Sequence, residues 1–234
     1  MMSLKISRRE LLQKSLASFG ALSLPISLTA CGGDSDDGMQ SDSVKADFLH
    51  GVASGDPLKD KVILWTRLTP NDVSLRLEVI WEIALDQKFS QLVNAGKVQT
   101  AQAQDFTVKV DANKLRSNQR YYYRFRYGNV ISPIGQTKTL PETSNTVSFA
   151  VCSCSNYPAG YFHVYQDIAK QDVDVVIHLG DYIYEYGKDG YATEDAAKLG
   201  RELALDNNKE MITLDDYRKR YALYRKDVDL QTVH

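Results

Sequence analysis

The stretch TVSFAVCSCSNYPAGYFHVYQDIAKQDVDVVIHLGD, residues 146–181, decides the fold of the second half of this chain. It begins with an apolar, β-branched run at 146–154 that predicts a buried strand, and it ends with a second such run at 173–181. Between them, apolar residues at helical spacing over 161–171 predict a short helix. This order predicts a βαβ unit whose two strands run parallel and whose sheet is covered on both faces.

The sequence before this unit predicts a small β-sandwich over residues 45–141. Four segments alternate as strands do, with turn-rich pieces between them: 62–68, 75–85, 105–112 and 120–128. Leu115 and Tyr121 have the spacing of the tyrosine corner of fibronectin type III-like sandwiches, where the phenol caps a loop; the alternative is a strand tyrosine at a solvated edge. Trp65 and Trp81 predict packing rather than ligand stacking. The predicted fold is mixed: an all-β fibronectin-like sandwich followed by the first βαβ part of an α/β domain.

Residues 1–31 have the pattern of an export signal. SRRELLQK, with Arg8 and Arg9, resembles a twin-arginine signal, and LTAC, ending at Cys31, resembles a lipobox whose cysteine is lipidated. The alternative is an ordinary signal peptide with an incidental cysteine. The polar segment 32–44 predicts a flexible linker. We therefore expect a protein exported to the bacterial periplasm or cell envelope by the twin-arginine machinery, which contacts the membrane only through a lipid anchor.

Composition narrows the function only a little. The chain has 234 residues and a formal net charge of -2, which gives no reason to expect nucleic-acid binding. Three cysteines are too few for a disulfide framework. A disulfide between Cys152 and Cys154 would strain extended backbone, so the sequence disfavours it.

The two strands predicted in the βαβ unit end in residues that can bind a metal. Ligands bind beyond the carboxyl ends of the strands of an open parallel sheet, and Cys154 and Asp181 lie there. Neighbouring strands are about 4.8 Å apart, so both side chains can reach one ion or a close metal pair. Tyr184 adds a phenol, whose reference pKa of about 10 suits a trivalent hard ion better than most divalent ones. Together these residues indicate Fe(III) rather than zinc, and the remaining carboxylate oxygens suit Ca(II) or Mg(II).

Each of these residues also has an ordinary structural explanation. Cys154 alone could be a small core residue, and Asp181 after a glycine could cap the next turn. His178 predicts a hydrogen-bonded core histidine. Tyr182 and Tyr186 predict packing.

Two helices are predicted near the C-terminal end, over 213–225 and from Asp229 onward. Thr213 and Asp216 have the spacing of a capping box at the start of the first. One face of this helix carries Leu214, Tyr217, Tyr221 and Tyr224. Three arginines lie elsewhere on it: Arg218, Arg220 and Arg225. The arginines predict a solvated face, with phosphate binding as the alternative. The polar segment 187–212 gives no prediction.

These motifs resemble the PhoD-type alkaline phosphatase and phosphodiesterase family. The similar segments follow one another along most of the chain: 48–70, 149–169, 176–187 and 213–234. The resemblance implies the family's N-terminal β-sandwich over 45–141 and the start of its α/β metallophosphatase domain over 146–234. It also implies an exported hydrolase that splits phosphate esters with Fe(III) and Ca(II). By position, Cys154 and Tyr184 match iron-binding residues, and Asp181 matches the metal-bridging aspartate.

The sequence departs from the family pattern in one respect. Family members continue through a DDHE-like segment and later Asn, Asp and His ligands, which this sequence does not contain. We therefore expect an N-terminal fragment with little or no phosphatase activity of its own, which calcium- and iron-dependent turnover would contradict. The alternative function is an envelope-anchored lipoprotein that binds a partner through its sandwich without catalysis.

Overall fold

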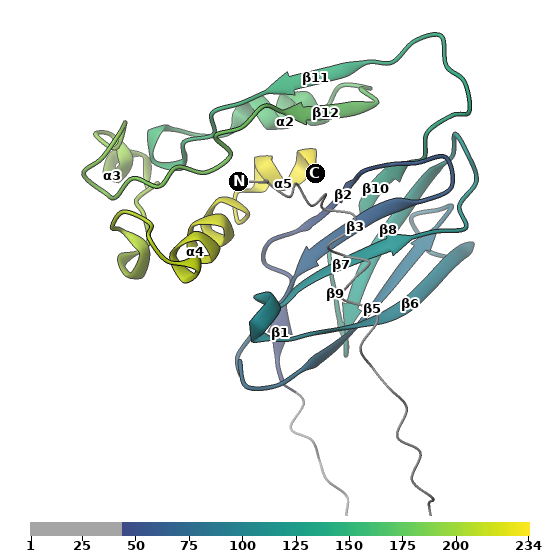
Figure 1. Cartoon of the computed structure of the whole chain (residues 1–234), viewed down its shortest axis with the longest axis horizontal. Helices are drawn as coiled ribbons and strands as arrows, with labels where there is room; N and C mark the ends of the chain where they lie inside the picture. Colours follow the sequence, from purple (N-terminus) through teal and green to yellow (C-terminus); the bar gives the residue numbers. More distant parts are fainter. Residues whose placement is uncertain (1–43) are drawn as a thin grey trace, which may run out of the picture. The chain divides into compact units, whose positions relative to one another are not determined.

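A computed structural model describes residues 44–234 of the chain (Figure 1). The predicted export and lipidation residues Arg8, Arg9 and Cys31 lie outside the described residues, as does nearly all of the predicted linker. Within 44–234, no helix has the length and apolar character needed to cross a membrane.

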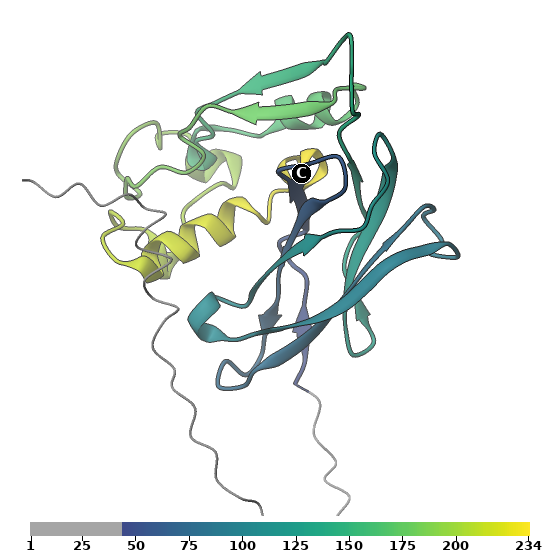
Figure 2. The ribbon, with the colours of Figure 1, turned by 45° about the vertical axis from the view of Figure 1, so that its right-hand side comes forward.

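Two antiparallel sheets form a β-sandwich, seen as two layers in Figures 1 and 2. One sheet has the order β2-β3-β7, and the other has the order β10-β8-β5-β6 with β9 paired to β8. A two-stranded ribbon pairs β1 with β4. The strands are β1 (Ala46–Asp47), β2 (Val52–Gly55), β3 (Val62–Arg67), β4 (Thr69–Pro70), β5 (Leu77–Ala84), β6 (Leu92–Thr100), β7 (Thr107–Ala112), β8 (Arg120–Tyr127), β9 (Val130–Ile131) and β10 (Gly135–Lys138).

Side-chain alternation places the core of the sandwich between its two sheets. On β3, Val62 and Leu64 are buried, and on β8 Tyr123 and Phe125 are buried in the same cluster. Trp81 of β5 joins this cluster, which confirms its predicted packing role. Alternate residues of a strand point to opposite faces, so the alternating patterns were sufficient to locate β3, β5, β7 and β8.

The predicted loop contact of Tyr121 is confirmed. Its side chain is buried, and its phenol oxygen accepts a hydrogen bond from the backbone N–H of Arg116 at 2.7 Å. The alternative, a tyrosine at a solvated edge, is therefore wrong. The phenol satisfies a donor in the loop before β8, which fixes the entry of that strand.

Strand β6 has no strong signal in the sequence because its central residues include Asn94 and Gly96. The structure explains the glycine: a Cβ at Gly96 would lie 2.7 Å from the Trp81 ring nitrogen. The indole of the neighbouring strand thus occupies the space that a side chain would fill.

The predicted βαβ unit is present. Strands β11 (Phe149–Cys152) and β12 (Val175–His178) pair in parallel, with Cys152 opposite His178, and helix α2 (His163–Ala169) connects them. Both cysteines of the strand region, Cys152 and Cys154, are free thiols, as the sequence predicted.

The prediction that both faces of this sheet are covered is wrong for the described residues. One face packs on a second cluster that contains Tyr165 of α2 and Leu230 of α5 (Val228–Val233). On the other face, Phe149 is 55% and Val151 is 58% exposed. The reason is that α2 and α5 contribute to the same cluster, so the apolar residues of the opposite face meet no packing partner within 44–234.

Helix α4 (Leu214–Tyr224) begins as predicted but buries a different face. Thr213 and Asp216 form the capping box, each side chain bonding the other residue's backbone N–H. The prediction that the three arginines are solvated is wrong for two of them, because Arg220 is 1% and Arg225 is 0% exposed. By contrast, Leu214 is 66% exposed. Guanidinium groups can be buried where several acceptors converge on them. All three nitrogens of Arg220 find such partners, whereas only Nη2 of Arg225 does.

Arg225 joins α4 to the sandwich. Its Nη2 donates to the carbonyls of His50 at 3.1 Å and Val52 at 3.2 Å. Trp65 of β3 packs edge-to-face on Tyr221 of α4, with ring centroids 6.2 Å apart, so its predicted packing role is confirmed. The backbone N–H of Ser54 also donates to the His234 carbonyl at 3.2 Å.

Buried His50 and half-buried His234 make stability dependent on pH at this contact. Burial, helped by nearby cations including Arg225, lowers the pKa of His50 and of His234 to about 3. The folded-state pKa lies below the ordinary value of about 6.5, so each contribution to stability is complete above that pH and is lost as the pH falls below it. We expect His50→Asn to reduce the pH slope of the unfolding free energy between pH 6 and 4.5 by about 1.4 kcal/mol per pH unit. Urea unfolding at several pH values measures this slope; equal slopes in both proteins would contradict the assignment.

Candidate metal centre

The loops that follow β11 and β12 are fixed to each other at the carboxyl end of the parallel pair. The N–H of Cys154 donates to the Gly180 carbonyl at 3.1 Å, and the N–H of Ser155 donates to the Asp181 carbonyl at 2.8 Å. Cys154 and Asp181 both have left-handed backbone conformations, with φ of 62° and 53°. Residues other than glycine rarely adopt such values, and strain of this kind gathers at functional sites.

The three side chains predicted as metal ligands meet at one carboxylate oxygen. The Cys154 Sγ lies 3.6 Å from Oδ2 of Asp181, and the Tyr184 hydroxyl donates to the same oxygen at 3.3 Å. Cys154 and Asp181 are exposed and Tyr184 is half-buried, so a phosphate-sized ligand can reach them from solvent. The structure therefore brings together two strand ends and a residue three positions further along the chain.

The electrostatics of this group call for a cation. Desolvation, followed by the hydrogen bond and charge of Cys154 and the charge of Asp181, raises the pKa of the Tyr184 phenol. Among the described residues, no Lys, Arg or His forms an ion pair with Asp181. Three donors that can all become anionic thus surround one point without a protein cation. Two hard oxygen donors and one soft thiol form a set that could hold a transition-metal ion.

The phenol is needed to complete this donor set. No group of three His, Cys, Asp or Glu side chains within 44–234 could hold a metal ion. The candidate centre is therefore a thiol, a carboxylate and a phenol, and the roles of these residues as ligands stay a prediction.

A hydrogen-bonded cluster supports the loop that carries Cys154. Ser155 contacts the Tyr165 hydroxyl, and Nε2 of His178 lies 3.0 Å from the Ser155 hydroxyl and 3.1 Å from that of Tyr165. The N–H of Gly180 donates to Nδ1 of His178 at 3.3 Å, so the proton of the neutral ring is on Nε2. Burial lowers the pKa of His178, with Asp181 opposing. The predicted hydrogen bonds of His178 are confirmed, although the residue is half-buried rather than in the core. No sequence pattern pointed to this role of Ser155, which follows Cys154, or of Tyr165, which lies on the predicted helix.

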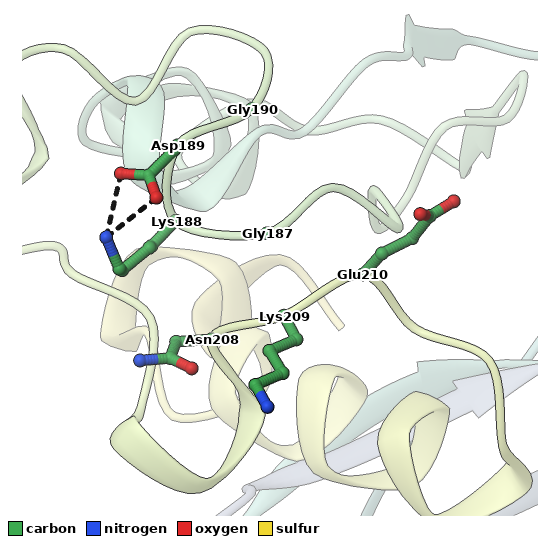
Figure 3. A pocket seen from close by; sticks show the side chains of 7 residues that line it. All are labelled: Gly187, Lys188, Asp189, Gly190, Asn208, Lys209 and Glu210. Carbon is green, nitrogen blue, oxygen red and sulfur yellow. Dashed lines mark hydrogen bonds and ion pairs between the residues drawn. The ribbon is translucent and has the colours of Figure 1, made fainter.

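A shallow hollow lies beyond the tyrosines that follow Asp181. Figure 3 shows its two walls, the loop from Gly187 to Gly190 and the segment from Asn208 to Glu210. The hollow has a volume of about 610 Å³. Lys188 pairs with Asp189 at 2.7 Å, and the wall also holds one further lysine and one glutamate. The charges of the lining residues balance, so the hollow has no net preference for phosphate.

The ring of Tyr184 belongs to an aromatic cluster. The ring of Tyr184 stacks on Tyr186 with centroids 6.2 Å apart, and Tyr191 lies 6.0 Å from Tyr186. Tyr182 instead packs on Tyr221 at 5.6 Å. The predicted packing role of Tyr182 is confirmed. Tyr186 contacts two tyrosine rings but is 43% exposed.

Comparison with known proteins gives a consistent result over the whole described region. The family model "PhoD-like phosphatase, N-terminal domain" matches residues 33–141, and the model "PhoD-like phosphatase" matches residues 149–234. Alkaline phosphatase D of Bacillus subtilis is 43% identical over 196 residues, which cover 80% of this chain and 33% of that protein. The solved structure of PhoD matches with a TM-score of 0.72 and 42% identity, covering 82% of this chain and 37% of the other. The chain thus spans about a third of the length of these relatives.

Proposed function

The chain belongs to the PhoD-like phosphatase family, and on that premise we propose that it carries part of the metal centre of an exported phosphoric-ester hydrolase. The observation that carries this proposal is the convergence of Cys154 and Tyr184 on one oxygen of Asp181. The substrate class is a phosphate monoester or diester. The proposed metal ions are Fe(III) and Ca(II).

The three donors have distinct parts in this proposal. Cys154 and Tyr184 would hold the Fe(III), because both can supply an anionic donor. Both contact Oδ2 of Asp181, whose carboxylate would be a further donor to the ions. The bound ions would supply Lewis-acid stabilisation of negative charge on the phosphoryl oxygens. The chain's own contribution is to hold these donors in place through the cross-linked loops after β11 and β12.

The alternative function, a lipoprotein that binds through its sandwich without catalysis, is not favoured. Residues 149–234 match a phosphatase model in their own right, and the candidate centre lies among them. For the sandwich itself, we infer the fibronectin type III-like class, supported by the contact between Tyr121 and the Arg116 N–H.

Export and anchoring complete the proposal. We propose export by the twin-arginine machinery through Arg8 and Arg9, and lipidation at Cys31 in the periplasm or cell envelope. The twin-arginine route carries folded proteins, so the metal ions could be bound before export.

The proposed activity can be tested in a chimera with the Bacillus subtilis relative. We expect a chimera, in which this chain replaces the matching segment of Bacillus subtilis alkaline phosphatase D, to hydrolyse p-nitrophenyl phosphate or its bis-ester when Fe(III) and Ca(II) are present. Chelation or Asp181→Asn should remove that activity, because both eliminate the proposed centre. The 234-residue chain alone should show little turnover, since its described residues supply only three donors. Hydrolysis by the chimera that survives both treatments would contradict the proposal.

A further inference from the structure

Arg220 is a buried cation whose side-chain hydrogen bonds all go to residues outside its own helix. From α4 its Nε donates to Oδ1 of Asn207 at 3.0 Å. Its Nη2 donates to the carbonyls of Asn207 at 2.9 Å and Lys209 at 3.3 Å. Its Nη1 donates to the carbonyls of Tyr184 at 2.6 Å and Tyr186 at 2.9 Å. One guanidinium therefore joins two segments that are separate in the sequence.

The first of these segments carries the proposed phenol ligand. The carbonyls of Tyr184 and Tyr186 meet at one Arg220 nitrogen, which fixes the backbone on both sides of residue 185. The side chain of Tyr184 then reaches Asp181. An arginine with a planar fork of donors suits this task, because its direction as well as its charge is defined.

The second segment holds the first from the opposite side. The N–H of Met211 donates to the Glu185 carbonyl at 2.9 Å, and the N–H of Lys188 donates to the Asn208 carbonyl at 2.8 Å. Figure 3 shows the continuation of the first segment, Gly187 to Gly190, facing Asn208 to Glu210 of the second. Arg220 lies where their backbones converge, so its loss would loosen both.

We propose that Arg220 is the positioning residue of the metal centre, which holds the phenol of Tyr184 toward Asp181. This inference rests on the proposed Fe(III) site. Mutation of a residue that orients a metal ligand typically lowers the metal affinity about 10- to 100-fold.

Arg201 provides a matched control. It is also buried, and it donates to the Tyr157 carbonyl at 2.7 Å and pairs with Asp227 at 2.7 Å. None of its hydrogen bonds reaches the segment from Tyr182 to Lys188. Arg201→Lys thus tests for a general effect of disturbing a buried arginine in this half of the chain.

In the experiment, the 234-residue protein is titrated with Fe(III). The visible charge-transfer band of an Fe(III)–phenolate pair reports binding. Arg220→Lys keeps the charge but cannot reach both segments, so we expect its Fe(III) affinity to fall about 10- to 100-fold, with a weaker band. Arg201→Lys should stay within about threefold of wild type. Circular dichroism and thermal unfolding establish that each variant is folded.

Each outcome separates the inference from its premise. If the wild-type protein and Tyr184→Phe give the same titration without a band, the proposed metal centre itself is wrong. If that pair differs but Arg220→Lys binds as the wild type does, or Arg201→Lys loses as much, the positioning role is wrong. Should Arg220→Lys not fold, Asn207→Ala decides. It removes the acceptor of Nε together with the hydrogen bond from the Asn207 side chain to the Asp216 carbonyl, and it should weaken binding severalfold; an unchanged affinity would overturn the inference.

Discussion

Cys154→Ala is expected to weaken Fe(III) binding by the 234-residue protein by more than about 100-fold, beyond the usual effect of a partner that only orients a ligand. In the catalytically active chimera with the Bacillus subtilis relative, the same change should abolish phosphatase activity. The thiolate is a strong anionic donor, and alanine supplies none. The fold should be preserved, because Cys154 is exposed and its N–H still donates to the Gly180 carbonyl. Titration with Fe(III), followed by absorption, measures the change.

Cys152 offers the control for this substitution, two residues earlier in the chain. Its thiol lies 3.7 Å from the Ile177 carbonyl rather than at the candidate centre. Cys152→Ala should leave Fe(III) affinity within about threefold of wild type, since it touches none of the proposed ligands. The ligand assignment fails if Cys154→Ala binds as tightly as wild type, or if both variants lose affinity equally.

Leu64→Ala is expected to lower the unfolding free energy by about 2–5 kcal/mol. Leu64 lies on β3 with 0% of its surface exposed, between the two sheets of the sandwich. Removing its side chain loses burial of apolar surface and leaves a cavity that rigid neighbouring strands cannot fill. Urea unfolding, read by far-ultraviolet circular dichroism, measures the loss.

Leu205→Ala is the matched control for the core substitution. Leu205 is 91% exposed, so the same truncation should change the unfolding free energy by no more than about 0.5 kcal/mol. Equal losses in the two variants, or a loss below about 1 kcal/mol for Leu64→Ala, would show that this core does not determine stability.

The sequence was informative wherever a local pattern has one physical meaning. Alternation over 62–68 and 120–128 predicts strands, because half-buried strands repeat every two residues. The order strand, helix, strand predicts a parallel pair, and from that follows the approach of Cys154 to Asp181. The capping box at Thr213 is equally local, since both of its hydrogen bonds join residues three apart.

The sequence alone could not decide contacts between distant segments. Helical spacing sorts α4 into faces but does not say what lies opposite each face. It therefore suggested solvent for Arg225, whose carbonyl partner at His50 is 175 residues away. The uncovered face of β11 and β12 was missed for the same reason, because an apolar strand pattern records what could be buried and not which element arrives to cover it.

The same distinction between local patterns and distant contacts applies to the candidate metal centre. The sequence by itself determined which residue types end the two strands, and hence the proposed ligands Cys154, Asp181 and Tyr184. Only the tertiary structure decided how the phenol is held, because Arg220 acts on Tyr184 across 36 positions of the chain. Local patterns select the residues, whereas hydrogen bonds between remote segments fix their directions.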